Sequence, residues 1–189
     1  MIPYRSSDLS EISTHVRQQV SEIEHLLREG DMEHATWQPD ETSWSLVGHV
    51  AHMAVVNEPY VDAIEAALDQ APNSGSVGSS DRWKHPAVSI WFVRQNEPPP
   101  RLRIRTFKAM NPDPGTTPEQ ALSDIGRTHE RLLAVIESAR GRDLGRIRFG
   151  SPFLPLLRLS VGTAIGLIVA HTDRHIWLMR EVNQRRGRG

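Results

Sequence analysis

Four stretches of the sequence repeat apolar residues at the spacing of an amphipathic helix. The first runs from about Ser7 to Glu29 and is followed by Gly30, which favours helix termination. The second begins among the capping residues 42–45 and extends to about Gln70, before a segment rich in Pro, Gly and Ser. Pro59 lies inside this second stretch, so we predict either a kink there or a helix that stops and restarts.

The third stretch has the clearest start signal, with Thr117 as N-cap, Pro118 at the first helical position and Gln120 placed to close a capping box. We expect it to end at Gly141. The fourth stretch, from about Ser160 to Gln184, carries apolar residues and two histidines on or near one face. Four such helices predict an all-α fold, a four-helix bundle in which sites are built from side chains on facing helices.

Two connections between these helices stand out. Residues 72–116, between the second and third helices, form a connection far longer than the few residues that join ordinary antiparallel neighbours. Within it Arg101, Arg103 and Arg105 alternate with apolar residues, which predicts a short strand with a basic outer face. Residues 142–159 contain prolines and are predicted to have an irregular backbone.

Composition favours a single soluble domain over residues 1–189, with a flexible basic tail at 185–189. Apolar residues make up 38% of the chain and charged residues 24%, and no apolar run reaches the length of a membrane span. With no secretory signal and no cysteine, we expect a cytoplasmic protein whose metal chemistry would use imidazoles and carboxylates. A net charge of -1 argues against a nucleic-acid partner.

His171 and His175, in the fourth helix, are four residues apart. This spacing puts both imidazoles on one helix face with Cβ atoms about 6 Å apart, so that one metal ion can bridge them. Both lie on the apolar face beside Ile168 and Leu178, where an unpaired polar ring costs about 1–3 kcal/mol. The fold must therefore supply partners for them. Asp173 falls about 200° around the helix from His171 and is expected to be solvated.

A third candidate ligand, His52, follows Trp44 by eight residues in the second helix. The combination of Trp44 and Ser45 at a helix start, His52, and the His-x-x-x-His pair of the last helix resembles the DinB/YfiT-like family of metal-binding four-helix bundles. The resemblance implies one divalent metal ion, commonly nickel or zinc, held by His52, His171 and His175. Its remaining coordination positions would be open to water or substrate.

The chemistry of the residues agrees with that implication, because three neutral imidazoles suit zinc or nickel and leave a coordination position free, as in catalytic sites. His49, three residues before His52, could assist that residue or replace it, although the spacing from Trp44 favours His52 as the ligand. We interpret the other histidines as surface groups: His15, His25, His34, His85 and His129.

Three functional hypotheses follow. The resemblance implies that some family members add a low-molecular-weight thiol, such as bacillithiol, mycothiol or glutathione, to an electrophile. The first hypothesis is therefore a metal-dependent thiol S-transferase in which Arg101, Arg103 or Arg105 meets a carboxylate of the thiol. The second, a metal-dependent hydrolase, ranks lower because no glutamate stands beside the histidine pair as a general base. The third is a homodimeric, metal-stabilised or metal-sensing bundle without turnover.

Overall fold

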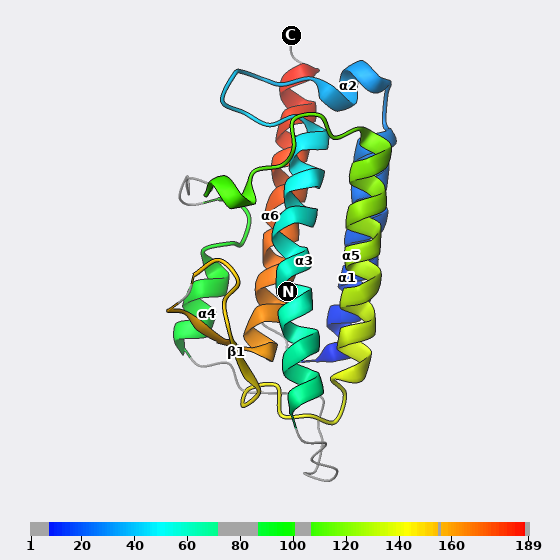
Figure 1. Ribbon diagram of the computed structural model, residues 1–189. Coiled ribbons are helices and arrows are strands. Elements are labelled where there is room, and N and C mark those ends of the chain that lie inside the picture. The colour runs from blue at the N-terminus through cyan, green and yellow to red at the C-terminus, as the bar shows by residue number, and fades with distance from the viewer. Residues whose placement is uncertain (1–7, 72–86, 101–106, 155, 188–189) are drawn as a thin grey trace.

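The computed structural model describes residues 8–71, 87–100, 107–154 and 156–187. Four long helices stand side by side and form a bundle (Figure 1). This confirms the predicted all-α, four-helix architecture. The four helices are α1 (Leu9–Arg28), α3 (Leu46–Gln70), α5 (Pro118–Ser138) and α6 (Val161–Arg186). The shorter elements are α2 (Met32–Thr36), α4 (Ala87–Arg94), the 3-10 helix η2 (Lys108–Met110), and the strands β1 (Arg148–Gly150) and β2 (Arg158–Ser160).

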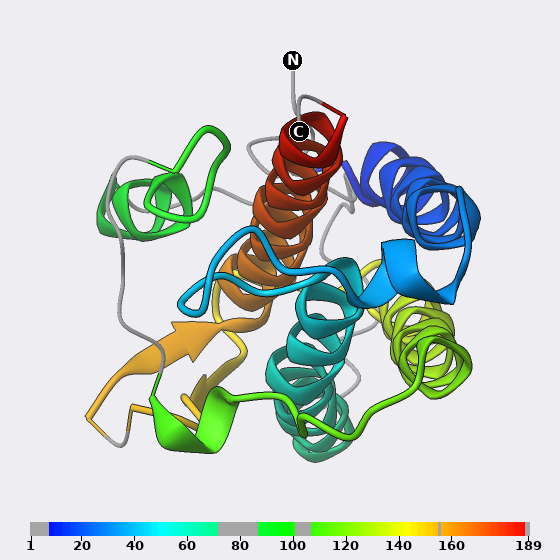
Figure 2. The ribbon, with the colours of Figure 1, turned by 90° about the horizontal axis from the view of Figure 1, so that it is seen from above.

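The direction of the helices explains the long connection. The helices α3 and α5 run in the same direction and lie side by side, whereas α1 and α6 run the opposite way (Figure 1). After α3 the chain must therefore return along the whole bundle, roughly 37 Å for a helix of this length, before α5 can begin. The described parts of this return lie against α6 and α3, with α4 beside α6 (Figure 2).

Side-chain caps begin all four long helices. The side chain of Asp8 accepts from backbone N–H groups at the start of α1, and those of Ser45, Thr117 and Ser160 do the same for α3, α5 and α6. Each cap satisfies backbone donors that have no partner within the helix, which is worth about 1 kcal/mol. The predicted starts of the second, third and fourth helices therefore agree closely with the observed ones.

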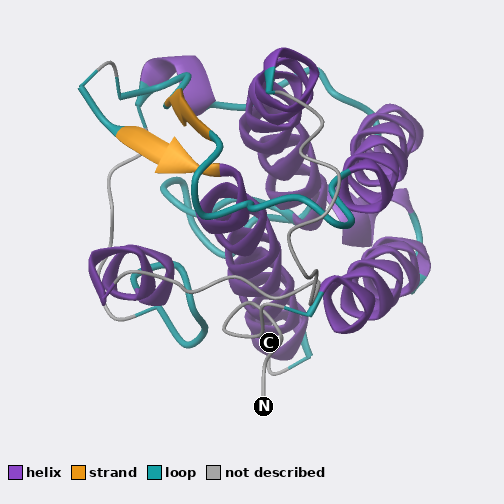
Figure 3. Ribbon diagram, turned by 90° about the horizontal axis from the view of Figure 1, so that it is seen from below, coloured by secondary structure: helices purple, strands orange, loops and turns teal. Residues whose placement is uncertain are grey.

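Two details of the backbone differ from the predictions. The helix α3 passes through Pro59 as one continuous element, so the expectation that it stops and restarts is wrong. Within residues 142–159 the strands β1 and β2 pair antiparallel, with Phe149 opposite Leu159, and pack against α3 and α6 (Figure 3). The pairing supplies hydrogen bonds where an irregular backbone was predicted. The strand predicted at Arg101–Arg105 lies outside the described residues.

The helices α5 and α6 bury different amounts of their surface. Charged residues cover the outward face of α5, as the predicted apolar stripe requires, whereas residues 161–170 at the start of α6 are buried on every side. This part of α6 is enclosed by four neighbours, namely the hairpin formed by β1 and β2, and the helices α1, α3 and α4. Polar side chains that follow it on the same helix consequently point into the protein, where they need partners.

Candidate metal centre

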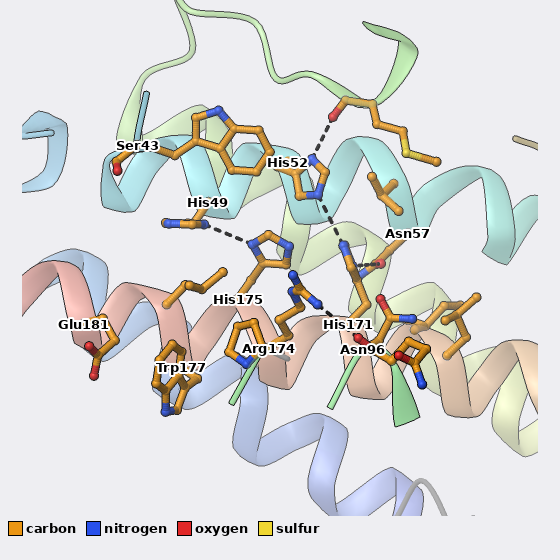
Figure 4. A pocket seen from close by; sticks show the side chains of 18 of the residues that line it. Ser43, His49, His52, Asn57, Asn96, His171, Arg174, His175, Trp177 and Glu181 are labelled. Carbon is orange, nitrogen blue, oxygen red and sulfur yellow. Dashed lines mark hydrogen bonds between the residues drawn. The ribbon is translucent and has the colours of Figure 1, made fainter. Parts of the chain in front are cut away.

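His52, in the second turn of α3, meets His171 and His175, which lie near the middle of α6 (Figure 4). One nitrogen of each imidazole lies within 4.8 Å of the corresponding nitrogens of the other two. His52 and His175 are buried, and His171 is partly exposed. The structure thus brings together the three histidines that the sequence singled out, and among the described residues they form the group that could hold a metal ion.

The hydrogen bond of His52 determines which of its nitrogens carries the proton. Its Nδ1 lies 2.7 Å from the backbone carbonyl oxygen of Met110, which belongs to the long connection. A carbonyl only accepts, so Nδ1 carries the hydrogen and donates it. The Nε2 atom of His52 is left with a lone pair that points at the other histidines.

The same arrangement recurs at His171. Its Nδ1 lies 3.1 Å from the amide oxygen Oδ1 of Asn57 on α3, and donates to it. Its Nε2 then also carries a lone pair, and lies 3.3 Å from Nε2 of His52. Two lone pairs that face each other at this distance repel unless a cation lies between them. Two nitrogen ligands bound tetrahedrally to one zinc ion would lie about 3.3 Å apart, so this donor set fits a divalent metal.

A proton is a poor substitute for that cation near neutral pH. Burial lowers the pKa of His52 from 6.5 to about 4, and the positive charge of Arg174 adds to the effect. Burial, with repulsion from the neighbouring imidazoles and Arg174, also holds the pKa values of His171 and His175 well below 6.5. The three imidazoles are therefore neutral at pH 7, the form in which a histidine binds a metal.

His49 lies beside this group. Its Nδ1 is 3.0 Å from Nδ1 of His175, and burial lowers its pKa to about 3. Both rings are therefore neutral, and one of the two Nδ1 atoms donates its hydrogen to the other. When His175 donates, its Nε2 is left free, as in the other two histidines. The geometry therefore gives His49 a contact with His175 and leaves it outside the group of three.

A cavity of about 810 Å³ opens on the histidines and is within the size range of small-molecule sites. Trp44 forms one wall, with its ring centroid 4.5 Å from that of His52. Arg174 also lines the cavity, and its Nη1 donates to the carbonyl of Gln95 at 3.0 Å. The rest of the lining is largely apolar and includes the aromatic side chains Tyr60, Trp91, Phe107 and Trp177.

Sequence reasoning missed three contributors to the site: Asn57, Arg174 and the Met110 carbonyl. Asn57 had a usable signal, because it is a polar residue on the apolar face of a helix, the same observation that singled out His171. Arg174 looked like one more charged residue of a helix. The Met110 carbonyl had no signal, since its contact joins residues 58 positions apart through the backbone of a long connection.

Some predictions for polar residues were wrong. His129 is fully buried in α5 instead of lying on the surface. Asp173 is mostly shielded from solvent, because its carboxylate accepts hydrogen bonds from His15 and Gln19 on α1 at 2.7–2.9 Å. The packing of α1 against α6 covers the side of α6 that was expected to be solvated. His25 is exposed as predicted, and His85 lies outside the described residues.

The fold and the site together define a helical-bundle protein with a buried histidine group that could bind a divalent metal. Residues 15–179 match the family model of the DinB superfamily, and the chain belongs to that superfamily. This confirms the resemblance inferred from Trp44, Ser45 and the three histidines. In the described residues no helix is both long and apolar enough to cross a membrane.

The structural neighbours include YfiT from Bacillus subtilis, described as a probable metal-dependent hydrolase with an unusual four-helix bundle topology. The TM-score is 0.62 at 14% sequence identity, and the match covers 96% of this chain and 89% of YfiT. At this identity the likeness establishes the shared fold. A search of curated proteins finds no match.

Proposed function

We propose that this protein is a metal-dependent thiol S-transferase that holds one nickel or zinc ion on His52, His171 and His175. The observation that carries the proposal is the convergence of three neutral imidazoles on the wall of a largely apolar cavity. Membership of the DinB superfamily supports the metal-binding part. The transferase part rests on the size and lining of the cavity and on the poor supply of bases beside it.

When bound, a divalent metal acts as a Lewis acid that lowers the pKa of a coordinating thiol or water. The protein's residues would bind the metal and position the reactants. Three protein ligands leave room for a reactant to coordinate, and the aromatic walls suit the apolar part of an electrophile. Arg174 adds a positive charge that favours an anionic group in the cavity. The candidates Arg101, Arg103 and Arg105 lie outside the described residues.

Hydrolysis fits the site less well because it needs a general base within hydrogen-bond reach of the attacking water. Among the described residues that line the cavity, the one carboxylate is Glu181. It follows His175 by six residues, roughly 9 Å along the helix axis. His49 is engaged with His175. The hydrolase hypothesis is therefore the second candidate, favoured by the description of YfiT as a probable metal-dependent hydrolase.

The test is an activity screen on protein loaded with nickel or zinc. Bacillithiol, mycothiol and glutathione would each be offered together with monochlorobimane, and ester and amide substrates would be offered in parallel assays. We expect metal-dependent conjugation with at least one thiol, abolished by His171→Ala and retained by His25→Ala, a change at an exposed position. Metal-dependent hydrolysis without conjugation would replace the transferase with the hydrolase.

A bundle that uses the metal for stability or sensing alone would behave differently. It would bind the metal and gain thermal stability in proportion to the logarithm of metal concentration, but would turn over none of the substrates.

Light scattering with and without metal would show at the same time whether the protein is a homodimer. We place the reaction in the cytoplasm, where low-molecular-weight thiols are abundant.

A further inference from the structure

A chain of polar groups crosses the buried contact between α3 and α6 directly behind His171. It consists of Asn57 and Thr172, both of which are almost completely inaccessible to solvent. The hydroxyl of Thr172 donates to the carbonyl of Ile168 at 3.0 Å, and the Nδ2 of Asn57 donates to the Thr172 oxygen at 3.1 Å. The Oδ1 of Asn57 lies 3.1 Å from Nδ1 of His171 (Figure 4).

The direction of each hydrogen bond between Ile168 and His171 follows from the carbonyl group at which the series ends, that of Ile168. The Ile168 carbonyl has no hydrogen, so the Thr172 hydroxyl must donate to it. Its oxygen can then only accept from Asn57, which turns the NH₂ group of the amide toward Thr172. The amide oxygen is thereby turned toward His171, and that histidine must donate from Nδ1.

This sequence of bonds has a consequence for the site. A neutral imidazole carries one hydrogen, so a His171 that donates from Nδ1 has an unprotonated Nε2, the atom that lies 3.3 Å from Nε2 of His52. If the amide of Asn57 were reversed, its NH₂ group would donate to Nδ1 of His171. The hydrogen of His171 would then be on Nε2, where it would block metal coordination.

We infer that Asn57 and Thr172 are positioning residues that hold His171 in its Nδ1–H tautomer and so keep Nε2 available as a metal ligand. The inference rests on the metal-binding part of the proposed function and is independent of the reaction catalysed. Partners of metal-binding histidines fix the tautomer and ring orientation, and their loss typically costs about 10- to 100-fold in metal affinity.

The chain offers a matched pair of substitutions and a matched control. Thr172→Val removes the hydroxyl at nearly constant volume, whereas Thr172→Ser keeps it. Thr128 on α5 is an equally buried threonine whose hydroxyl donates to the carbonyl four residues earlier, that of Asp124, at 2.9 Å. Thr128→Val therefore removes the same kind of hydrogen bond from a helix that carries none of the three histidines.

Two measurements test the inference. Long-range ¹H–¹⁵N spectra of the metal-free protein report the tautomer of each histidine, and competition with a chromophoric chelator gives the zinc and nickel affinities. We expect His171 to be in the Nδ1–H form in the wild type and in Thr172→Ser. In Thr172→Val we expect an Nε2–H population and about tenfold weaker metal binding, and Asn57→Leu should lose about 10- to 100-fold. Thr128→Val should bind as the wild type does.

Several results would overturn the inference. A wild-type His171 in the Nε2–H form contradicts it without any variant. Wild-type tautomer and affinity in Thr172→Val contradict it as well, and so does an equal loss of affinity in Thr128→Val. If the wild type bound neither metal, the proposed function would fail, while the tautomer spectra would still show whether Asn57 and Thr172 orient the ring.

Discussion

His171 in α6, which is partly exposed, and His129 in α5, which is fully buried, make similar hydrogen bonds but face different groups. Each donates from Nδ1 to an oxygen, that of Asn57 for His171 and the carbonyl of Ile125, at 2.9 Å, for His129. Burial lowers the pKa of both. The Nε2 of His171 faces another imidazole, whereas the buried Nε2 of His129 has no hydrogen-bond partner among the described residues.

A neutral imidazole and a group of converging imidazoles are different properties. Burial and a lowered pKa make an imidazole neutral, but neutrality alone does not create a metal site. His129 is the one histidine of α5, on a buried helix face that it shares with Ile125, Leu132 and Ile136. His171 has two further imidazoles whose nitrogens converge with its own. Such a convergence of imidazoles depends on how the helices that carry them are rotated toward each other, as α3 and α6 are here.

The largest expected difference between the two histidines is in metal affinity. Structural zinc binding is worth roughly 10–16 kcal/mol over four ligands, so loss of one ligand should weaken binding by about 10²- to 10³-fold. We expect this loss for His171→Ala, measured by chelator competition with zinc and nickel. His129→Leu should leave the affinity within about twofold of the wild type. Equal losses in the two variants would mean that no specific ligand set exists.

The second prediction concerns acid stability. Burial keeps the folded-state pKa of His129 below 6.5, so the unfolded chain takes up this proton first as the pH falls. The stabilisation is complete above pH 6.5 and is lost as the pH drops toward the folded pKa, by about 1.4 kcal/mol per pH unit. In urea unfolding of metal-free protein between pH 7 and pH 5, His129→Leu should lose correspondingly less stability than the wild type. Parallel curves for the two proteins would contradict this.

Substitution of His49 should weaken metal binding less than His171→Ala and more than His129→Leu. His49 contacts a candidate ligand, His175, through Nδ1, but is not one of the three. Replacing it by leucine removes the acceptor of His175, and we expect metal affinity to fall about tenfold, the lower end of the range for partners of metal ligands. His49→Gln keeps an acceptor and should recover most of this loss. A loss as large as that of His171→Ala would make His49 a ligand.

The smallest expected effect is a change in the free energy of unfolding of His129→Leu at neutral pH. His129→Leu removes a buried nitrogen without a hydrogen-bond partner and adds apolar contacts, which should raise the free energy of unfolding by about 1 kcal/mol. The control is His25→Leu on the exposed face of α1, where the change should stay within about 0.5 kcal/mol. A destabilised His129→Leu protein would indicate that Nε2 does have a partner in solution.

The bundle and the histidine pair were predictable because their signals are local. A cap such as Thr117 followed by Pro118 acts within one helical turn, and so does the spacing between His171 and His175. His129 could have been placed correctly on the same basis. It lies at helical spacing from Ile125, Leu132 and Ile136, an apolar stripe that outweighs its charged sequence neighbours.

The remainder of the site depends on contacts that no local pattern contains. Asn57 lies 114 residues from its partner His171, and the two meet only because of the angle at which α3 packs on α6. The distribution of buried polar groups could have marked Asn57 as a residue in need of a partner, without naming the partner. The shielding of Asp173 follows likewise from the position of α1, which its own helix does not reveal.

The acceptor that orients His52 belongs to the main chain at position 110, and every amino acid carries that carbonyl. Substitutions at this position can thus change the cavity wall, which Met110 helps to line, without removing the acceptor of His52. Deleting one residue between η2 and α5 would move the backbone carbonyl of residue 110 away from the His52 imidazole, whatever the side chain at position 110. The side chain at position 110 can therefore vary, provided that the length of the segment that carries this carbonyl is kept.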